Sequence, residues 1–249
     1  MAKQATAEKR QRRERGSINP DDIIKGAFEL AEDIGIDNLS MPLLGKHLGV
    51  GVTSIYWYFR KKDDLLNAMT DRALRQFAFA TPYVEATDWR ETLANHARTM
   101  RQTFMGSPIL CDLILIRSAL SPRAAKLGVQ EVESAVSSLV EAGLTPEQAF
   151  DTYSAMSLHV RGSVVLRRLR EKNLAANEGP GDIDDSLTFD PESAPLLAAI
   201  TQKGHHLSGS DDRNFEYGLE CILEHAARQI EQNKKPAARK ATKSTSRKS

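Results

Sequence analysis

Small hydroxyl groups and aromatic side chains with polar tips are concentrated in one short stretch near the start of the chain. In order, the stretch contains Thr53, Ser54, Tyr56, Trp57 and Tyr58. Small hydroxyls at the beginning of a helix can hydrogen-bond to base edges, whereas phenol and indole groups can donate to phosphate oxygens. Lys62 follows at the expected start of the next helix, where its charge adds to backbone N–H groups that attract a phosphate. This combination indicates contact with DNA.

Capping residues predict the helices that hold this stretch. Asn19 followed by Pro20 begins a first helix, which Gly35 closes. Ser40 caps a second helix that ends at Gly49, since glycine accepts the positive φ of such a turn. A third helix is expected from Val52 to about Phe59 and a fourth from Lys61. The second and third helices around a tight glycine turn are typical of a helix-turn-helix, although a packed helical corner with buried aromatics fits the same pattern.

The remainder of the chain also has helical spacing, and no segment alternates as a strand does. The sequence therefore predicts an all-α protein of about 9–10 helices. Beyond the first four, helices are expected at 88–105, 108–119, 122–142, 146–170, 191–202 and 213–232. A segment rich in glycine, proline and aspartate at 179–190 is expected to be a loop.

Charge is strongly segregated along the chain. Residues 1–16 carry +4 and residues 234–249 carry +7, so the rest carries −10 because the whole chain is +1. Both basic ends lack large apolar residues and are predicted to be disordered. They favour contact with nucleic acid, although basic tails also serve solubility alone. Between them we expect a helix-turn-helix domain at 17–77 and a larger helical domain at 82–233.

Residues 19–70 resemble the DNA-binding domain of the tetracycline-repressor (TetR) family of bacterial transcriptional regulators. The matching residues are Ala27-Phe28, Gly35, Leu39-Ser40-Met41, Leu44, Leu48-Gly49-Val50, Ile55-Tyr56-Trp57-Tyr58-Phe59, Lys62 and Leu65-Leu66. The resemblance implies that Ser40 caps the second helix at the backbone, that Thr53 and Ser54 face bases, and that the aromatic residues and Lys62 hold phosphates. The implied DNA-binding residues are Ser40, Gly51, Val52, Thr53, Ser54, Tyr56, Trp57, Tyr58 and Lys62.

Two departures from the family pattern affect which bases are recognised. Pro42 stands where the tetracycline repressors have a base-contacting arginine. Gly51 and Val52 occupy positions where longer polar side chains are expected. The operator sequence therefore cannot be carried over from the family.

The resemblance continues more weakly into the second domain, at 142–149 and 215–219. It implies that helices 146–170 and 213–232 form a four-helix interface between two copies of the chain. The last helix has one apolar stripe, which fits this interface but also fits an intramolecular core: Phe215, Leu219, Ile222, Leu223, Ala226 and Ile230. A helix-turn-helix that binds paired half-sites favours the interface.

A small, largely apolar inducer is expected to bind the second domain and to release a palindromic DNA operator. The candidate ligand-binding residues are His96, Met100, Phe104, Leu113, Ile116, Met156 and His159. Either histidine is also explained as a hydrogen-bonded core residue. The helix from about Asp88 is the candidate lever that transmits ligand binding to the DNA-binding domain.

Other chemistries find little support in the sequence. Nucleophile-elbow, phosphate-loop and zinc-helix motifs are absent, so no enzyme, cofactor or metal is expected. Adjacent His205 and His206 point apart, and Cys111 and Cys221 are interpreted as small hydrophobic residues. No segment predicts a membrane span or a secretory signal, so a cytoplasmic protein is expected. The alternative to a repressor is an architectural, weakly specific DNA-coating protein that uses its basic ends.

Overall fold

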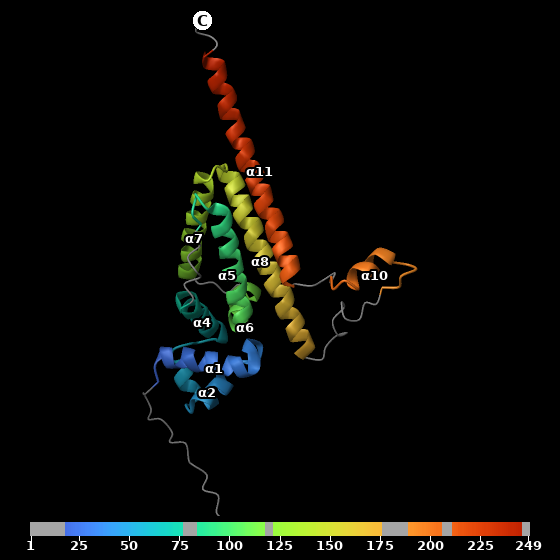
Figure 1. Ribbon diagram of the computed structural model, residues 1–249. Helices are drawn as coiled ribbons and strands as arrows, with labels where there is room; N and C mark the ends of the chain where they lie inside the picture. Colours follow the sequence, from blue (N-terminus) through green and yellow to red (C-terminus); the bar gives the residue numbers. More distant parts are fainter. Residues whose placement is uncertain (1–17, 77–83, 118–121, 176–188, 206–210, 246–249) are drawn as a thin grey trace, which may run out of the picture. The chain divides into compact units, whose positions relative to one another are not determined.

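The structure is a computed structural model that describes residues 18–76, 84–117, 122–175, 189–205 and 211–245. Every regular element in these ranges is helical, which confirms the all-α prediction (Figure 1). The helices are α1 (Pro20–Asn38), α2 (Met41–Leu48), α3 (Val52–Tyr56), α4 (Lys62–Gln76), α5 (Trp89–Gly106), α6 (Pro108–Leu110), the π-helix η1 (Cys111–Ile116), α7 (Pro122–Glu141), α8 (Pro146–Ala175), α10 (Pro195–Thr201) and α11 (Asp212–Thr245). They group into two compact units, Met1–Phe77 with Asp112–Ala125 and Ala78–Cys111 with Lys126–Ser249.

In the first unit, capping residues define α1 and α2 as the sequence predicts. The Asn19 side chain accepts a hydrogen bond from the Asp22 N–H at 2.8 Å, and Gly35 interrupts the helix with a φ of 76°. The Ser40 hydroxyl caps α2 by accepting from the Leu43 N–H at 3.4 Å. The core of the first unit is formed by buried residues from α1 to α4. Its fully buried members include Ile23, Leu44, Ile55, Leu65, Leu66 and Met69.

Two glycines set the geometry of the helix-turn-helix. Gly49 has φ 69° and ψ 26°, a left-handed conformation that a Cβ atom disfavours. Gly26 lies where α1 crosses α2, and a Cβ there would be 2.4 Å from Cδ2 of Leu48. A side chain at position 26 would therefore require the Leu48 side chain to move.

The third helix is shorter than predicted. It ends at Tyr56, and Trp57 and Tyr58 form a turn in which the N–H groups of Tyr58 and Phe59 both donate to the Ile55 carbonyl at 3.0 Å. β-Branched and aromatic residues dominate this segment and have modest helix propensity. Burial of Ile55 and Phe59 sets its conformation, so the helix stops once both side chains are in the core.

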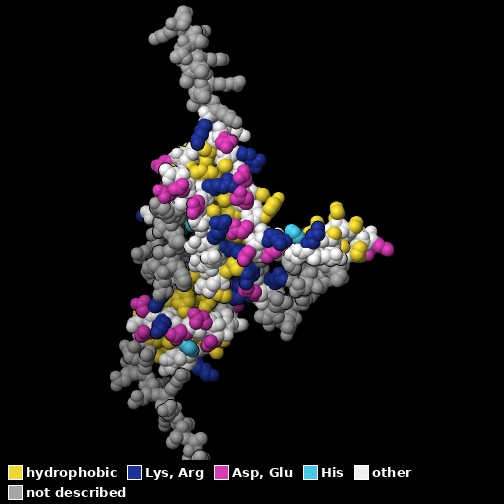
Figure 2. Space-filling view, in the orientation of Figure 1, with side chains coloured by type: hydrophobic (Ala, Val, Ile, Leu, Met, Phe, Trp, Pro, Cys, Tyr) yellow, Lys and Arg dark blue, Asp and Glu magenta, His cyan; other side chains and the backbone are white. Residues whose placement is uncertain are grey.

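In the second unit, α5, α7, α8 and α11 share one hydrophobic core, and α8 and α11 run side by side (Figure 1). The largest buried members come from all four helices and include Leu93, Leu139, Tyr153, Met156, Phe215, Leu219 and Leu223. Outside this core, α10 leaves Leu196 and Ile200 exposed. Hydrophobic side chains accordingly gather on α10 in the space-filling view (Figure 2).

Three segments differ from the predicted helices. The expected helix 108–119 is divided into α6 and the π-helix η1, in which the Arg117 N–H donates to the Asp112 carbonyl at 3.0 Å. The short helix expected at 191–202 begins only at Pro195, because 191–193 form a turn closed by Asp190. Where composition predicted a disordered end from 234, α11 continues to Thr245, in a segment rich in alanine, lysine and arginine, which favour helix. The arm 1–16 and most of the loop 179–190 lie outside the described residues.

The conformation of the α2–α3 turn predicts unequal effects for two neighbouring glycines. Gly49→Ala should destabilise the protein by about 1 kcal/mol, because alanine is strained at positive φ. Gly51 has a φ of −68° with open space around it but is the N-cap of α3, where glycine is preferred to alanine, so Gly51→Ala should cost no more than about 0.5 kcal/mol. Urea unfolding followed by circular dichroism measures both, and equal losses would contradict this account of the turn.

Candidate nucleic-acid interface and ligand pocket

The polar residues of α3 lie on its exposed side. Thr53 is exposed and Ser54 is partly exposed, whereas Ile55 is fully buried between them and the aromatic turn. Exposed fractions are 45% for Tyr56 and 83% for Trp57. These values exclude the alternative of a packed corner with buried aromatics. The exposed surface offers hydroxyl, phenol and indole groups for hydrogen bonds to DNA.

Other candidate DNA-binding residues flank this surface. Gly51 is exposed and Val52 is half-buried, and neither side chain offers a polar group to a base. Ser40 is half-buried, and its hydroxyl oxygen already caps α2. The hydroxyl proton of Ser40 is still available for a phosphate oxygen.

Lys62 already has a partner within the first unit. Its Nζ donates to the carbonyl of Asp37 at 3.0 Å, near the end of α1, where a cation interacts favourably with the helix dipole. Burial lowers the pKa of Lys62, and the charge of Arg117 lowers it further. Arg117 itself pairs with Asp63 at 3.2 Å. The other N–H groups of Lys62 can still donate to a phosphate. Its charge, however, also interacts with the end of α1.

Tyr58 is also engaged within the first unit, which sequence reasoning did not foresee. Its hydroxyl donates to the backbone carbonyl of Ile18 at 3.1 Å, although its side chain is otherwise 48% exposed. A carbonyl only accepts, so the single hydroxyl proton of Tyr58 is committed to Ile18. Tyr58 therefore differs from Tyr56, for which the structure gives no such bond.

Of the candidate ligand-binding residues, three lie in the second unit's core. His96 is 8% exposed, stacks on Tyr153 with ring centroids 6.0 Å apart, and lies 3.5 Å from the Tyr153 hydroxyl. Burial lowers the pKa of His96 to about 4, so its ring is neutral at pH 7. Met156 is fully buried in this core, and Met100 packs against it. His96 and Tyr153 place two polar groups inside an otherwise apolar environment.

The remaining candidates have separate surroundings. His159 Nε2 donates to the Phe215 carbonyl at 2.8 Å and its ring stacks on that residue, so it ties α8 to α11. Phe104 is buried beside a cavity of only about 10 Å³. Leu113 and Ile116 lie in the part of η1 from Asp112 onward, which belongs to the first unit. The structure thus does not gather all seven candidates around one cavity.

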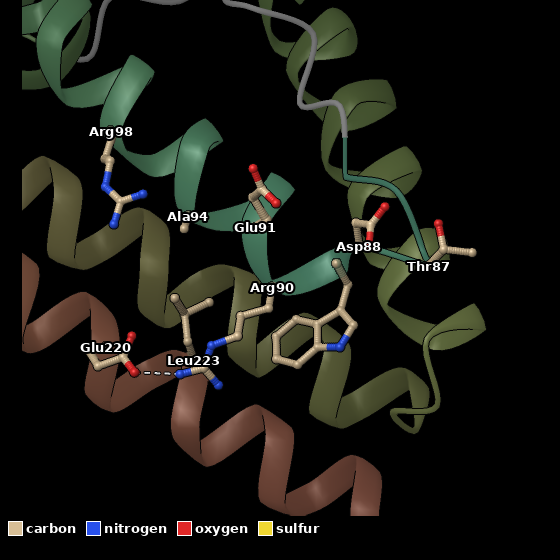
Figure 3. Close-up of a pocket in the computed structure, with 9 residues that line it drawn as sticks. Thr87, Asp88, Arg90, Glu91, Ala94, Arg98, Glu220 and Leu223 are labelled. Atoms are coloured by element: carbon tan, nitrogen blue, oxygen red, sulfur yellow. Dashed lines mark hydrogen bonds and ion pairs between the residues drawn. The ribbon is translucent and has the colours of Figure 1, made fainter.

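A larger pocket, of about 410 Å³, opens at the start of α5 and was not predicted (Figure 3). Its lining is mostly polar and includes Thr87, Asp88, Arg90, Glu91, Arg98 and Glu220. In Figure 3 the guanidinium of Arg90 points toward Glu220, and it also pairs with Glu224 at 2.6 Å. On α11, the acidic residues Glu216, Glu220 and Glu224 recur every four positions. This spacing is the sequence signal that could have indicated a row of ion pairs with α5.

The row of ion pairs continues along α5 and α11. Arg98 pairs with Glu216 at 2.7 Å, and Arg101 pairs with Asp212 at 2.6 Å. The Arg98 hydrogen bond holds the pKa of Glu216 below its usual range. Arg101 also lies 4.5 Å from the ring centroid of Phe215. This row of ion pairs joins α5 to α11 along one side of the core.

Two further predictions concern the cysteines and a membrane span. Cys111 is buried as expected of a small hydrophobic residue, but Cys221 is exposed because its position on α11 faces away from the core. Among the described helices, none is both long and apolar enough to cross a bilayer. His205 is exposed, and His206 lies outside the described residues.

Comparisons with known proteins agree with this architecture. Residues 23–69 match the family model described as bacterial regulatory proteins, tetR family, and residues 81–229 match the tetracyclin repressor-like C-terminal domain. The HTH-type transcriptional repressor Rv1353c of Mycobacterium tuberculosis is 66% identical over 240 residues, covering 96% of this chain and 92% of that protein. The class A tetracycline repressor from transposon 1721 of Escherichia coli is 27% identical over 212 residues, covering 85% and 91%.

Solved structures show the same fold. Apo ActR of Streptomyces coelicolor superposes with a TM-score of 0.65 at 24% identity, covering 88% of this chain and 99% of that one. TetR of Acinetobacter baumannii AYE gives 0.59 at 22% identity, covering 85% and 98%.

An exposed helix-turn-helix in one unit and a separate helical core in the other define the class of helix-turn-helix transcriptional regulators. Within that class, the chain belongs to the TetR family of bacterial regulatory proteins.

The buried neutral His96 predicts a specific loss of stability in acid. An unfolded chain binds a proton at this histidine below about pH 6.5, whereas the folded protein resists protonation until about pH 4. Stability is therefore fully present above pH 6.5 and falls as the pH drops toward 4, by about 3 kcal/mol at most. His96→Asn should flatten this part of the profile in urea unfolding at pH 7, 5.5 and 4.5.

The exposed His225 supplies the control. His225→Asn should leave the pH profile of the wild type unchanged. If His96→Asn also kept the full acid slope, His96 would not be the group responsible.

Proposed function

We propose that the protein is a transcriptional repressor that binds a palindromic DNA operator as a homodimer and releases it when a small, largely apolar molecule binds. The exposed surface of α3 carries the proposal, because buried Ile55 and Phe59 hold Thr53, Ser54, Tyr56 and Trp57 toward solvent. The 66% identical relative is named a transcriptional repressor, which supports repression rather than activation.

Base and phosphate contacts divide along α3. Thr53 and Ser54 lie in its first turn, where a recognition helix meets base edges in the major groove. Tyr56 and Trp57 lie at its other end, beside exposed Arg60 and Lys61, whose charges favour the phosphate backbone. Specificity then depends on a few small side chains, and affinity depends on the aromatic and cationic residues.

Selection of bound fragments from genomic DNA tests the function directly. A repressor should bind the selected sequence at least about 10³-fold more tightly than random duplex at physiological salt. A ratio near one would instead identify an architectural DNA-coating protein.

Substitutions then separate the two kinds of contact. Thr53→Ala or Ser54→Ala should change which operator variants are preferred, with about 1–3 kcal/mol of discrimination at the affected base pair. Tyr56→Ala or Lys62→Ala should weaken all duplexes alike, because phosphate contacts contain no sequence information. If Lys62→Ala changed operator choice while leaving random-DNA binding intact, these assignments would be wrong.

The proposed dimer uses a different surface from the apolar stripe predicted on the last helix. Phe215, Leu219, Leu223, Ala226 and Ile230 are buried in the protein's own core, so the assignment of this stripe to the interface was wrong. The wide stripe on α11 packs against α5 and α8 of the same chain. Ile222 is half-buried against the same core.

Several exposed apolar side chains of the second unit lie on α8. Exposed fractions are 72% for Leu158, 63% for Leu166 and 56% for Phe150, with Tyr217 of α11 at 74%. The opposite side of α8 is buried, so apolar residues lie on two sides of this helix, which is typical of helices covered on both sides. A second copy of the same helix pair supplies that cover, as in the four-helix interface that the family resemblance implies.

Two leucine substitutions separate interface from core. Leu158→Asp should give a folded, helical monomer with weak operator binding, because its side chain lies outside the core. Leu219→Asp should unfold the second unit, because it buries a charge at a residue 1% exposed. Sedimentation and circular dichroism measure both, and a wild type that is monomeric at micromolar concentration would contradict the dimer.

The proposed ligand site is the region of α5 and α8 around His96, Met100 and Met156. An apolar surrounding with the His96–Tyr153 pair suits a hydrophobic molecule that has one polar group. Solved structures of the same fold include ActR in complex with actinorhodin and a variant of the Acinetobacter baumannii TetR in complex with minocycline, which supports a small-molecule ligand here. Such a ligand releases DNA only if it binds the free conformation more tightly than the operator-bound one.

A further inference from the structure

We propose that the pocket at the start of α5 is a second small-molecule site, which binds an organic cation with an apolar body, such as a phenylalkylammonium ion. Every residue that lines it belongs to the second unit and to the described segments. The proposal goes beyond the repressor function, because binding at this site is measured without DNA.

The pocket lies on a different face of α5 from the region proposed for the inducer. Arg90, Ala94 and Arg98 line the pocket and recur every four residues, so they share the face of α5 that meets α11 (Figure 3). His96 is two residues from both Ala94 and Arg98, and two residues turn an α-helix by about 200°. A ligand in the pocket therefore does not occupy the core around His96.

The pocket has the size and the apolar wall that a small organic molecule needs. Its volume of about 410 Å³ lies within the range of roughly 300–1,000 Å³ that is usual for such sites. Ala94 and Leu223 are buried members of the core, and Trp89 packs against that core, so this wall is formed before a ligand binds. The indole of Trp89 also attracts a cation that lies over its ring.

Both arginines of the lining are already occupied. Arg90 pairs with Glu220 and Glu224, and Arg98 binds both carboxylate oxygens of Glu216, at 2.9 and 2.7 Å. An anionic ligand would have to displace these carboxylates from the guanidinium groups. The pocket is therefore poorly suited to an anion.

Two carboxylates of the lining are available to a cation. Asp88 and Glu91 are exposed, and within the described residues neither takes part in an ion pair. Asp88 precedes α5 at the N-cap position, but its side chain makes no capping hydrogen bond, so its oxygens are free to accept from a ligand.

The sum of charges around the pocket is negative. Two arginines and five carboxylates give a net charge of −3, the carboxylates being Asp88, Glu91, Glu216, Glu220 and Glu224. The dipole of α5 adds only about half a positive charge at its start. In the part of the chain that the structure describes, no three side chains are grouped to hold a metal ion. The expected ligand is therefore an organic cation, whose ammonium group meets the carboxylates while its body covers the apolar wall.

The fluorescence of Trp89 reports binding directly. The chain has two tryptophans, Trp57 and Trp89, so Trp57→Phe leaves the pocket indole as the only one. Trp57 is 83% exposed, and its replacement does not disturb a core. In this background the full-length protein is titrated at neutral pH and about 50 mM salt, where charge interactions are weakly screened. The probes are 2-phenylethylammonium, neutral 2-phenylethanol and anionic 3-phenylpropionate, which share one ring and differ in charge.

The ammonium ion should bind saturably and at least about 10-fold more tightly than the alcohol, and the carboxylate should bind most weakly. Asp88→Asn combined with Glu91→Gln removes two charges at nearly constant size. This double variant should weaken binding of the ammonium ion about 5- to 10-fold and change that of the alcohol less than about 2-fold. Both residues are exposed, so the variant should keep its helical content in circular dichroism.

Two matched controls locate the effect. Glu231→Gln makes the same kind of charge change at an exposed residue of α11 outside the lining, and it should leave all three affinities unchanged. His96→Asn alters the region proposed for the inducer, and it should also leave binding of the ammonium ion unchanged.

Four outcomes would overturn the inference. Equal affinities for the ammonium ion and the alcohol would show that charge is not recognised. A double variant that binds like the wild type would remove Asp88 and Glu91 from the site. An equal loss from Glu231→Gln would indicate attraction by the acidic surface as a whole, and a loss from His96→Asn would move the probe to the core. None of these results depends on whether an operator exists.

Discussion

The burial of Ile55 and Phe59 is the constraint on which the DNA-binding surface depends. A helix of five residues has only one side that can enter a core, and these two residues fix which side it is. The polar and aromatic residues between and before them must then face solvent. The close crossing at Gly26 and the left-handed Gly49 hold α2 at the distance and angle that keep Ile55 buried. The exposure of these hydroxyl, phenol and indole groups is therefore a consequence of how the core packs.

In the second unit the corresponding constraint acts on α8, which has apolar residues on opposite sides. Val160 and Met156 are buried in the core, while Leu158 and Leu166 are exposed. The ion pairs between α5 and α11 lie at the edge of this core and join the two helices on that side. They do not involve the outer side of α8, where Leu158 and Leu166 are exposed.

Local signals predicted much of the fold, and long-range packing decided the rest. The caps at Asn19 and Ser40 and the break at Gly35 were evident because each depends on neighbouring residues alone. The end of α3, the π-helix at Cys111–Ile116 and the burial of Leu219 depend on which distant segment packs against each, and sequence spacing does not contain that information. For the same reason the Tyr58–Ile18 bond, 40 residues apart in sequence, could not be foreseen, although both the tyrosine and the basic arm were identified.

The distribution of charge restricts where cations can assist DNA binding. The body between the basic ends carries −10, so it repels DNA, and only local groups of cations oppose this repulsion. At physiological salt charges act over about 8 Å, so cations assist binding only where they are held close to the phosphates. Exposed Arg60 and Lys61 meet this condition because α3 and α4 hold them.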